Sequence, residues 1–229
     1  MSRLPRHIAI DGPSGAGKSV LAERLAQRLG YRYIDTGAIY RAVTLAALKR
    51  GIDLADQDAI TQVAETVDIQ IETPTVDDGR QYTVLIDGED VTWAIRDRTV
   101  EQNVSTVSAV SGVRRALVPI QQRIAESGGV VMVGRDITTV VLPHAELKIY
   151  LTASAAKRAE RRHSQLAERG VQRDIALILA EIEERDRLDS TRADSPLTRA
   201  TDSILLENND ISVCDLVNIA CGIVERIGR

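Results

Sequence analysis

Residues 11–19 read DGPSGAGKS and follow the short apolar run HIAI, which is typical of a strand. The segment VLAERLAQRL follows this motif directly and has the pattern of a helix. In such a G-x-x-x-x-G-K-[ST] motif, the glycines let backbone amides converge on a phosphate, and the helix N-terminus adds the positive end of its dipole. The stretch is therefore predicted to bind ATP through Gly12, Pro13, Ser14, Gly15, Ala16, Gly17, Lys18, Ser19 and Val20.

Two side chains of this loop carry the expected chemistry. Lys18 would reach the β- and γ-phosphates, and the Ser19 hydroxyl would ligate a Mg²⁺ ion that bridges them. Two roles stay open for Asp11, which could contact the metal through water or cap the turn. A glycine-rich turn that merely joins strand to helix is the alternative to a nucleotide site. A guanine-nucleotide switch is disfavoured, because neither D-x-x-G nor N-K-x-D follows in the sequence.

A second strand, YRYI, ends in the segment DTGAIYR at residues 35–41. Small residues at the start of a helix, with Arg41 one turn inside it, would form a second anion pocket at the carboxyl edge of the sheet. Two facing anion pockets suggest a phosphoryl donor and an acceptor. An ordinary helix cap with a solvated arginine is the alternative.

The strand GGVVMV runs into Gly134, Arg135 and Asp136, which would present a guanidinium and a carboxylate at the same edge. This pair is predicted to recognise a polar ligand. The alternative is that Arg135 and Asp136 simply pair with each other at the strand end.

Near residue 185 an apolar helical stripe becomes charged, with Arg185, Asp189 and Arg192 on nearly one face. One end of this helix is expected to pack and the other to reach for a ligand, although such a stripe is also typical of a solvated face with ion pairs. Arg158 and Arg161, together with Arg162, share a face of the preceding helix and would suit a mobile cover over ATP.

The elements that must position these residues alternate between strand and helix patterns. Such alternation predicts an α/β fold with a parallel sheet covered by helices on both faces. Strands are expected at 6–10, 31–34, 130–133, 146–151 and 202–206. Helices are expected at 18–29, 38–50, 56–66, 113–126, 155–169, 174–190 and 212–227. The stretch 68–92 alternates with short turns and is predicted to be a small antiparallel insertion.

The amino-acid composition limits the classes of binding partner that are expected. A net charge of −4 and 3% aromatic residues among 229 provide neither a basic surface nor stacking platforms, so no nucleic-acid polymer is expected. No segment is apolar enough to predict a membrane span, and a cytoplasmic protein is expected. Cys214 and Cys221 are predicted to be buried small residues on one helix face, without a disulfide.

Taken together, DGPSGAGKS, DTGAIYR, IDGEDVTWAIR, VGRDITTVV and ERDRLDSTR resemble the bacterial cytidylate kinase family in order and spacing, over essentially the whole chain. The resemblance implies a three-layer, adenylate-kinase-like P-loop fold with a small antiparallel insertion and a helical lid. Its expected parts are a core at 1–67, a substrate-binding insertion at 68–92, core at 93–157, a lid at 158–192 and core at 193–229.

The resemblance also implies roles for single residues. The acceptor monophosphate would be held by Thr36, Arg41, Arg135, Arg185 and Arg192. Asp189 would hold the ribose hydroxyls, and Ser105, Arg114 and Asp136 would read the cytosine edge. Two positions depart from the family pattern. Val133 stands where an Asp is usual, which leaves Mg²⁺ to Ser19, phosphates and water, and Thr138 stands where a Gly is usual.

The expected reaction transfers the γ-phosphoryl of ATP to CMP or dCMP, with Mg²⁺ and with Lys18, Arg135, Arg185 and Arg192 as catalytic residues. A phosphate monoester is mostly ionised at pH 7, so no strong general base is required. The chain is expected to act as a monomer. The alternatives are a P-loop kinase for another small acceptor, such as shikimate, and an ATP-binding sensor that transfers nothing.

Overall fold

A five-stranded parallel sheet forms the centre of the computed structural model, which describes residues 4–168 and 170–228. Its strands are β1 (His7–Asp11), β2 (Arg32–Asp35), β6 (Val130–Gly134), β7 (Leu147–Thr152) and β8 (Ile204–Glu207). They lie in the order β2-β6-β1-β7-β8, and each adjacent pair is parallel. The predicted parallel sheet is confirmed, and the carboxyl ends of all five strands meet at one edge.

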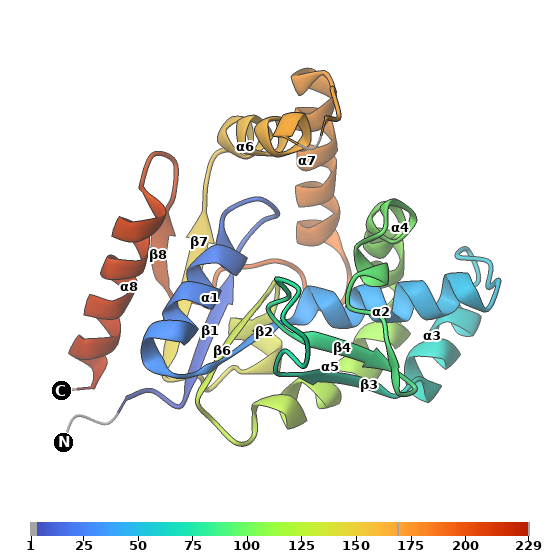
Figure 1. Ribbon diagram of the computed structural model, residues 1–229, viewed down its shortest axis with the longest axis horizontal. Coiled ribbons are helices and arrows are strands. Elements are labelled where there is room, and N and C mark those ends of the chain that lie inside the picture. The colour runs from blue at the N-terminus through green and yellow to red at the C-terminus, as the bar shows by residue number, and fades with distance from the viewer. Residues whose placement is uncertain (1–3, 169, 229) are drawn as a thin grey trace.

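Two layers of helices cover this sheet (Figure 1). On one face, helices α1 (Lys18–Leu29) and α8 (Val213–Ile227) pack against Ile8 and Ile10 of β1. On the other face, Ala9 packs with α5 (Ser111–Ala125) and a short π-helical turn, η2 (Ile137–Val141). Alternate residues of a buried strand point to opposite faces, so the apolar residues Ile8, Ala9 and Ile10 let β1 anchor both layers.

A second apolar cluster lies beside the sheet and contains α2 (Thr36–Lys49), α3 (Gln57–Thr66) and α4 (Arg98–Ala109). The antiparallel strands β3 (Ile69–Glu72), β4 (Thr83–Ile86) and β5 (Glu89–Asp90) pack on this cluster and are followed by the single turn η1 (Ala94–Arg96). The predicted antiparallel insertion is thus confirmed as a separate three-stranded sheet.

Helices α6 (Ala155–Glu168) and α7 (Ile175–Thr191) pack against each other and project from the carboxyl edge, at the top of Figure 1. The helix expected at 155–169 is described to Glu168, and residue 169 lies outside the described residues. Within the part of the chain that the structure describes, the search for a helix long and apolar enough to cross a membrane finds none.

Helix α4 was not among the predicted helices. Its sequence RTVEQNVSTVSA is rich in Val, Thr and Ser, which have low intrinsic helix propensity. Burial of Val100, Val104 and Val107 on one face, next to α2 and α5, stabilises it instead.

The expectation that both cysteines are buried was wrong. Cys214 is exposed and Cys221 is half-buried, and both are free thiols. Helix α8 buries the face that carries Leu216, Val217 and Ala220, which leaves Cys214 on the solvent side. A spacing of seven residues places two side chains on the same face of a helix, but the spacing does not determine which face of the helix packs against the protein.

Leu21 of α1 and Leu177 of α7 provide a matched test of this packing, because their exposed fractions are 0% and 58%. Leu21→Ala is expected to lower the free energy of unfolding by about 2–5 kcal/mol, since it leaves a cavity between α1 and the sheet. Leu177→Ala should change it by less than about 0.5 kcal/mol. Urea denaturation followed by circular dichroism measures both, and equal losses would contradict the assigned core.

Candidate active site

The loop between β1 and α1 comes so close to β7 that its first residue must be glycine. Gly12 has a φ of 149°, and a Cβ there would lie 1.9 Å from the carbonyl oxygen of Leu151. Helix α1 begins after Gly17, which has a φ of 99°. The Lys18 ammonium group donates to the carbonyl oxygen of Pro13 at 2.7 Å, so the lysine folds back over its own loop.

Lys18 is 7% exposed, and burial lowers its pKa well below the ordinary value. The nearby charge of Arg135 lowers the pKa further, whereas Asp11, Asp35 and Asp189 raise it. Three elements beyond the loop therefore bring charged groups close to Lys18. A bound phosphate would stabilise the ammonium form in this setting.

Asp11 is buried, and its carboxylate is occupied by the turn that follows β6. Its Oδ1 accepts from the backbone N–H of Ile137 at 2.9 Å. Its Oδ2 accepts from the backbone N–H of Thr138 at 2.7 Å and from the Thr138 hydroxyl at 2.6 Å. The carboxylate thus joins the strand before the phosphate loop to the Gly-Arg-Asp segment, a role that neither open alternative had included. Thr138, at the departure from the family pattern, takes part in this contact.

At the start of α2, the N-cap Asp35 accepts from the backbone N–H of Gly37 and from Arg41 Nη2, both at 2.9 Å. A Cβ at Gly37 would lie 3.1 Å from Arg41 Nη1, so the guanidinium sits directly over the helix N-terminus. Thr36 donates its hydroxyl to the carbonyl oxygen of Val133 at 2.8 Å, which attaches this helix end to β6. The cap predicted by the alternative is present, but Arg41 is half-buried and paired with Asp35 rather than freely solvated.

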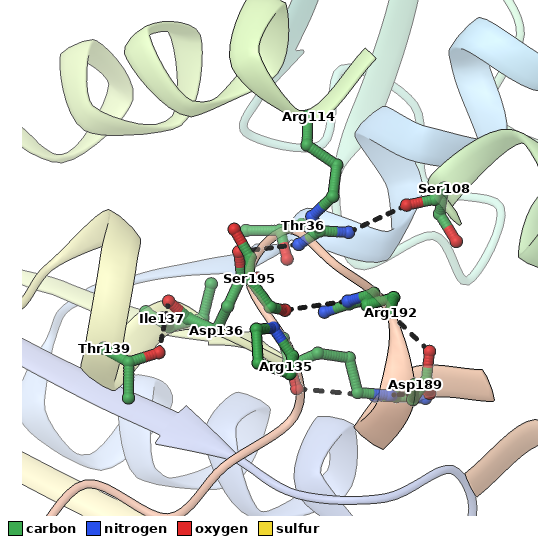
Figure 2. Close-up of polar contacts among 12 residues, drawn as sticks. Thr36, Ser108, Arg114, Arg135, Asp136, Ile137, Thr139, Asp189, Arg192 and Ser195 are labelled. Atoms are coloured by element: carbon green, nitrogen blue, oxygen red, sulfur yellow. Dashed lines mark hydrogen bonds and ion pairs between the residues drawn. The ribbon is translucent and has the colours of Figure 1, made fainter. Parts of the chain in front are cut away.

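Arg135 and Asp136 do not pair with each other, which excludes that alternative. Arg135 Nε donates to Asp189 Oδ2 at 2.8 Å, and Asp136 Oδ2 accepts from Arg114 Nη2 at 2.6 Å. Figure 2 shows these contacts, with Arg114 coming from α5 and Asp189 from α7. The end of β6 is therefore connected to two helices that are distant in sequence.

Arg114 also lies with its guanidinium carbon 5.1 Å from the centre of the Tyr40 ring and donates to the carbonyl oxygen of Ser108 at 3.0 Å. Ser105, one turn earlier on α4, accepts through its own carbonyl oxygen from the Ser108 hydroxyl. The structure therefore brings Arg114 and Asp136 into direct contact and places Ser105 on the adjacent helix.

Asp189 and Arg192 at the end of α7 are largely buried rather than solvated. Arg192 Nη1 lies 3.4 Å from Asp189 Oδ1, and Arg192 Nε donates to the carbonyl oxygen of Ser195 at 2.7 Å. Burial alone would raise the pKa of Asp189, yet Arg135 holds this pKa below its ordinary value. Asp189 therefore stays ionised and shared between two arginines.

Arg185, one turn earlier, is the least compensated cation of the group. Burial lowers its pKa to about 10, and the charges of Arg135 and Arg41 add to this shift. Its buried Nε has no hydrogen-bond partner among the residues that the structure describes. Arg41 and Arg135 are thus close enough for their charges to act on Arg185, and the charge of Arg135 also acts on Lys18.

On the other side of the phosphate loop, Arg158 donates to the carbonyl oxygen of Ser14 at 3.0 Å and pairs with Asp186 of α7. Its Cβ lies 3.3 Å from the position that a Cβ on Gly15 would take. Arg161 donates to the carbonyl oxygen of Asn208 at 2.7 Å. Arg162, predicted to share this face, pairs instead with Glu101 of α4.

Asn208 contacts the phosphate loop but was not predicted from the sequence as a site residue. Its amide donates to the carbonyl oxygen of Ala16 at 2.9 Å, inside the phosphate loop, and a Cβ on Gly17 would lie 2.8 Å from this amide nitrogen. It follows β8 directly, so the rule that strand ends at the carboxyl edge supply site residues could have found it.

For a metal ion, the described residues offer no group of three or more His, Cys, Asp or Glu side chains. Ser19 is exposed in the first turn of α1, and Val20 beside it is 44% exposed. Since Asp11 is fully engaged with the backbone of Ile137 and Thr138, the Ser19 hydroxyl is the loop side chain suited to a hard cation held mainly by phosphate and water oxygens.

Comparison with known proteins agrees with this arrangement. The family model for cytidylate kinase matches residues 8–226. A protein named cytidylate kinase from Chloroflexus aggregans is 51% identical over 215 residues, covering 94% of this chain and 92% of its own. A second from Rhodococcus opacus is 51% identical over 218 residues, covering 95% and 93%.

One solved structure, of an uncharacterized protein from Eubacterium ventriosum, shares the fold with a TM-score of 0.52 at 12% identity, covering 96% of this chain and 98% of its own. The family match runs from within β1 to within α8, and the relatives match over nearly their full lengths. The chain belongs to the cytidylate kinase family.

Proposed function

We propose that this chain transfers the γ-phosphoryl group of ATP to CMP, and to dCMP, producing ADP and CDP or dCDP. The observation that carries the proposal is the convergence of Lys18, Arg41, Arg135 and Arg185 at one edge of the sheet. Burial and the charge of Arg135 lower the pKa of both Lys18 and Arg185, so this site favours an anion of high charge. Two phosphorylated ligands that meet there supply such a charge.

In this proposal ATP lies along the loop from Gly12 to Val20, with its phosphates over the N-terminus of α1. Arg158 and Arg161 cover this loop from α6, which is consistent with their contacts to Ser14 and Asn208. Residues 158–192 act as a lid that excludes water, so that the phosphoryl group passes to the acceptor rather than to a water molecule.

The acceptor lies on the other side of Lys18. Its monophosphate is held by Thr36, Arg41, Arg135, Arg185 and Arg192. Asp189 binds the ribose hydroxyls while it also orients Arg135. Ser105, Arg114 and Asp136 read the cytosine edge, and the Arg114–Asp136 contact at 2.6 Å supports this role because each group fixes the direction of the other.

The nucleophile is a phosphate oxygen of CMP, whose second pKa of about 6 makes it largely ionised at neutral pH. Catalysis therefore depends on position and charge rather than on a general base. Lys18, Arg135, Arg185 and Arg192 offset the repulsion between the two ligands and stabilise the charge on the transferred group. In this proposal the Ser19 hydroxyl would hold the Mg²⁺ ion that accompanies ATP, and the ion would supply neutralisation of part of the phosphate charge.

An acceptor panel tests the reaction directly. CMP and dCMP are expected to be phosphorylated with the highest kcat/KM among CMP, dCMP, UMP, AMP, GMP and shikimate, because the Arg114–Asp136 pair suits the cytosine edge. A coupled assay of ADP release measures the series. Preference for shikimate or another acceptor would overturn the substrate assignment, and ATP binding without transfer to any acceptor would indicate a sensor.

Substitution of single cations tests the catalytic roles proposed for Lys18 and Arg185. Lys18→Ala and Arg185→Ala are each expected to lower kcat by about 10²-fold or more, because each removes charge stabilisation of the transferred group. Lys49→Ala and Arg187→Ala are the matched controls, since Lys49 pairs with Glu89 and Arg187 with Glu184 on the surface. These controls should keep kcat within about 2-fold, as is usual for exposed pairs. Wild-type kcat in Lys18→Ala and Arg185→Ala would contradict the assigned roles.

A further inference from the structure

A chain of polar contacts connects the antiparallel sheet to the start of α2. Tyr82, directly before β4, donates its hydroxyl to Asp35 Oδ2 at 3.3 Å. Arg96, at the end of η1, donates through Nη2 to the Tyr82 hydroxyl oxygen at 3.1 Å. Arg41 reaches the same Asp35 oxygen at 2.9 Å. The order of contacts is therefore Arg96, Tyr82, Asp35 and Arg41.

The Asp35 carboxylate is the shared acceptor in this chain. Its Oδ1 accepts from the backbone of Gly37, and its Oδ2 accepts from both Arg41 and Tyr82. Burial alone would raise the pKa of Asp35, yet Arg41, and to a smaller extent Arg96, hold it below its ordinary value. Two arginines are thus close enough to act on one carboxylate, but only Arg41 contacts it directly.

Tyr82 is buried, and its hydroxyl bonds Arg96 directly and the Asp35 carboxylate that holds Arg41. It is 2% exposed, and its ring centre lies 5.9 Å from that of Tyr33 at an interplanar angle of 47°. The guanidinium of Arg96 lies 5.7 Å from the centre of the Tyr82 ring and 5.7 Å from that of Trp93. The hydroxyl accepts from Arg96 on one side and donates to Asp35 on the other.

We propose that Tyr82 is a positioning residue for the acceptor phosphate: its hydroxyl keeps Arg96 off the Asp35 carboxylate, so that Asp35 holds Arg41 over the start of α2. This inference rests on the proposed role of Arg41 in binding the CMP phosphate. Without the hydroxyl, Arg96 loses its acceptor and is attracted to Asp35, where it competes with Arg41. The insertion thereby sets the geometry of a pocket to which it contributes no cation of its own.

Tyr82→Phe tests the inference, because it removes the hydroxyl and keeps the ring between Tyr33 and Arg96. The KM for CMP is expected to rise about 5- to 10-fold, in keeping with the loss of one hydrogen bond in a charged network, while the KM for ATP stays unchanged. Tyr31→Phe is the matched control, since the Tyr31 hydroxyl donates to the carbonyl oxygen of Pro5 at the opposite end of β2. It should leave both KM values unchanged.

A second substitution separates positioning from simple loss of structure. Arg96→Gln in the Tyr82→Phe background removes the competing cation and is expected to return the KM for CMP to within about 2-fold of wild type. No such recovery is expected if Tyr82 only supports packing. An unchanged KM in Tyr82→Phe, or a raised KM that Arg96→Gln does not restore, would overturn the proposal.

Arg41→Ala distinguishes failure of this inference from failure of the proposed function. If Arg41 binds the CMP phosphate, Arg41→Ala raises the KM for CMP, and adding Tyr82→Phe to it raises the KM no further, because the two residues act through one group. An unchanged KM in Arg41→Ala would overturn the role of Arg41 itself. Additive effects in the double variant would overturn the action of Tyr82 through Arg41 and leave the role of Arg41 intact.

Discussion

Mutual repulsion among buried cations is the constraint on which the rest of this structure depends. Burial lowers the pKa of Lys18 and of Arg185, and the nearby charge of Arg135 lowers both further. Such a group is stable in a folded protein only if carboxylates or a bound anion compensate it. The protein supplies part of this compensation through Asp35 and Asp189 and leaves Arg185 without a carboxylate in direct contact among the described residues.

The carboxylates of the site act mainly as connections between elements that are far apart in sequence. Asp11 joins the end of β1 to the turn after β6, and Asp136 joins the end of β6 to α5. Asp189 joins α7 to the same strand end, and Asp35 joins α2 to the antiparallel sheet. Each therefore fixes the place of a cation or a loop at the proposed phosphate sites. The shape of the site is thus set by largely buried carboxylates and their polar partners, whose interactions are strong at low local dielectric.

Much of the fold could be predicted from the sequence, because the patterns that indicate strands, helices and turns are local. The five parallel strands and most helices were predicted within a few residues, and the antiparallel insertion was recognised from its alternation and turns. Helix α4 was missed because its Val, Thr and Ser residues favour other structures until Val100, Val104 and Val107 are buried by α2 and α5. The prediction that Cys214 is buried was wrong for a related reason, since packing against neighbouring elements determines which face of α8 is buried.

By itself, the sequence determined the phosphate loop, the parallel sheet and the membership of a kinase family, because glycine spacing, strand ends and helix starts act over a few consecutive residues. Only the tertiary structure decided which charges meet. Arg135 and Asp136 are neighbours in the chain but take partners 54 and 22 residues away, and Asp35 is reached by Tyr82 across 47 residues. Coulomb energy depends on distance in space, so the partner of a buried charge is settled only when the elements that carry it have packed.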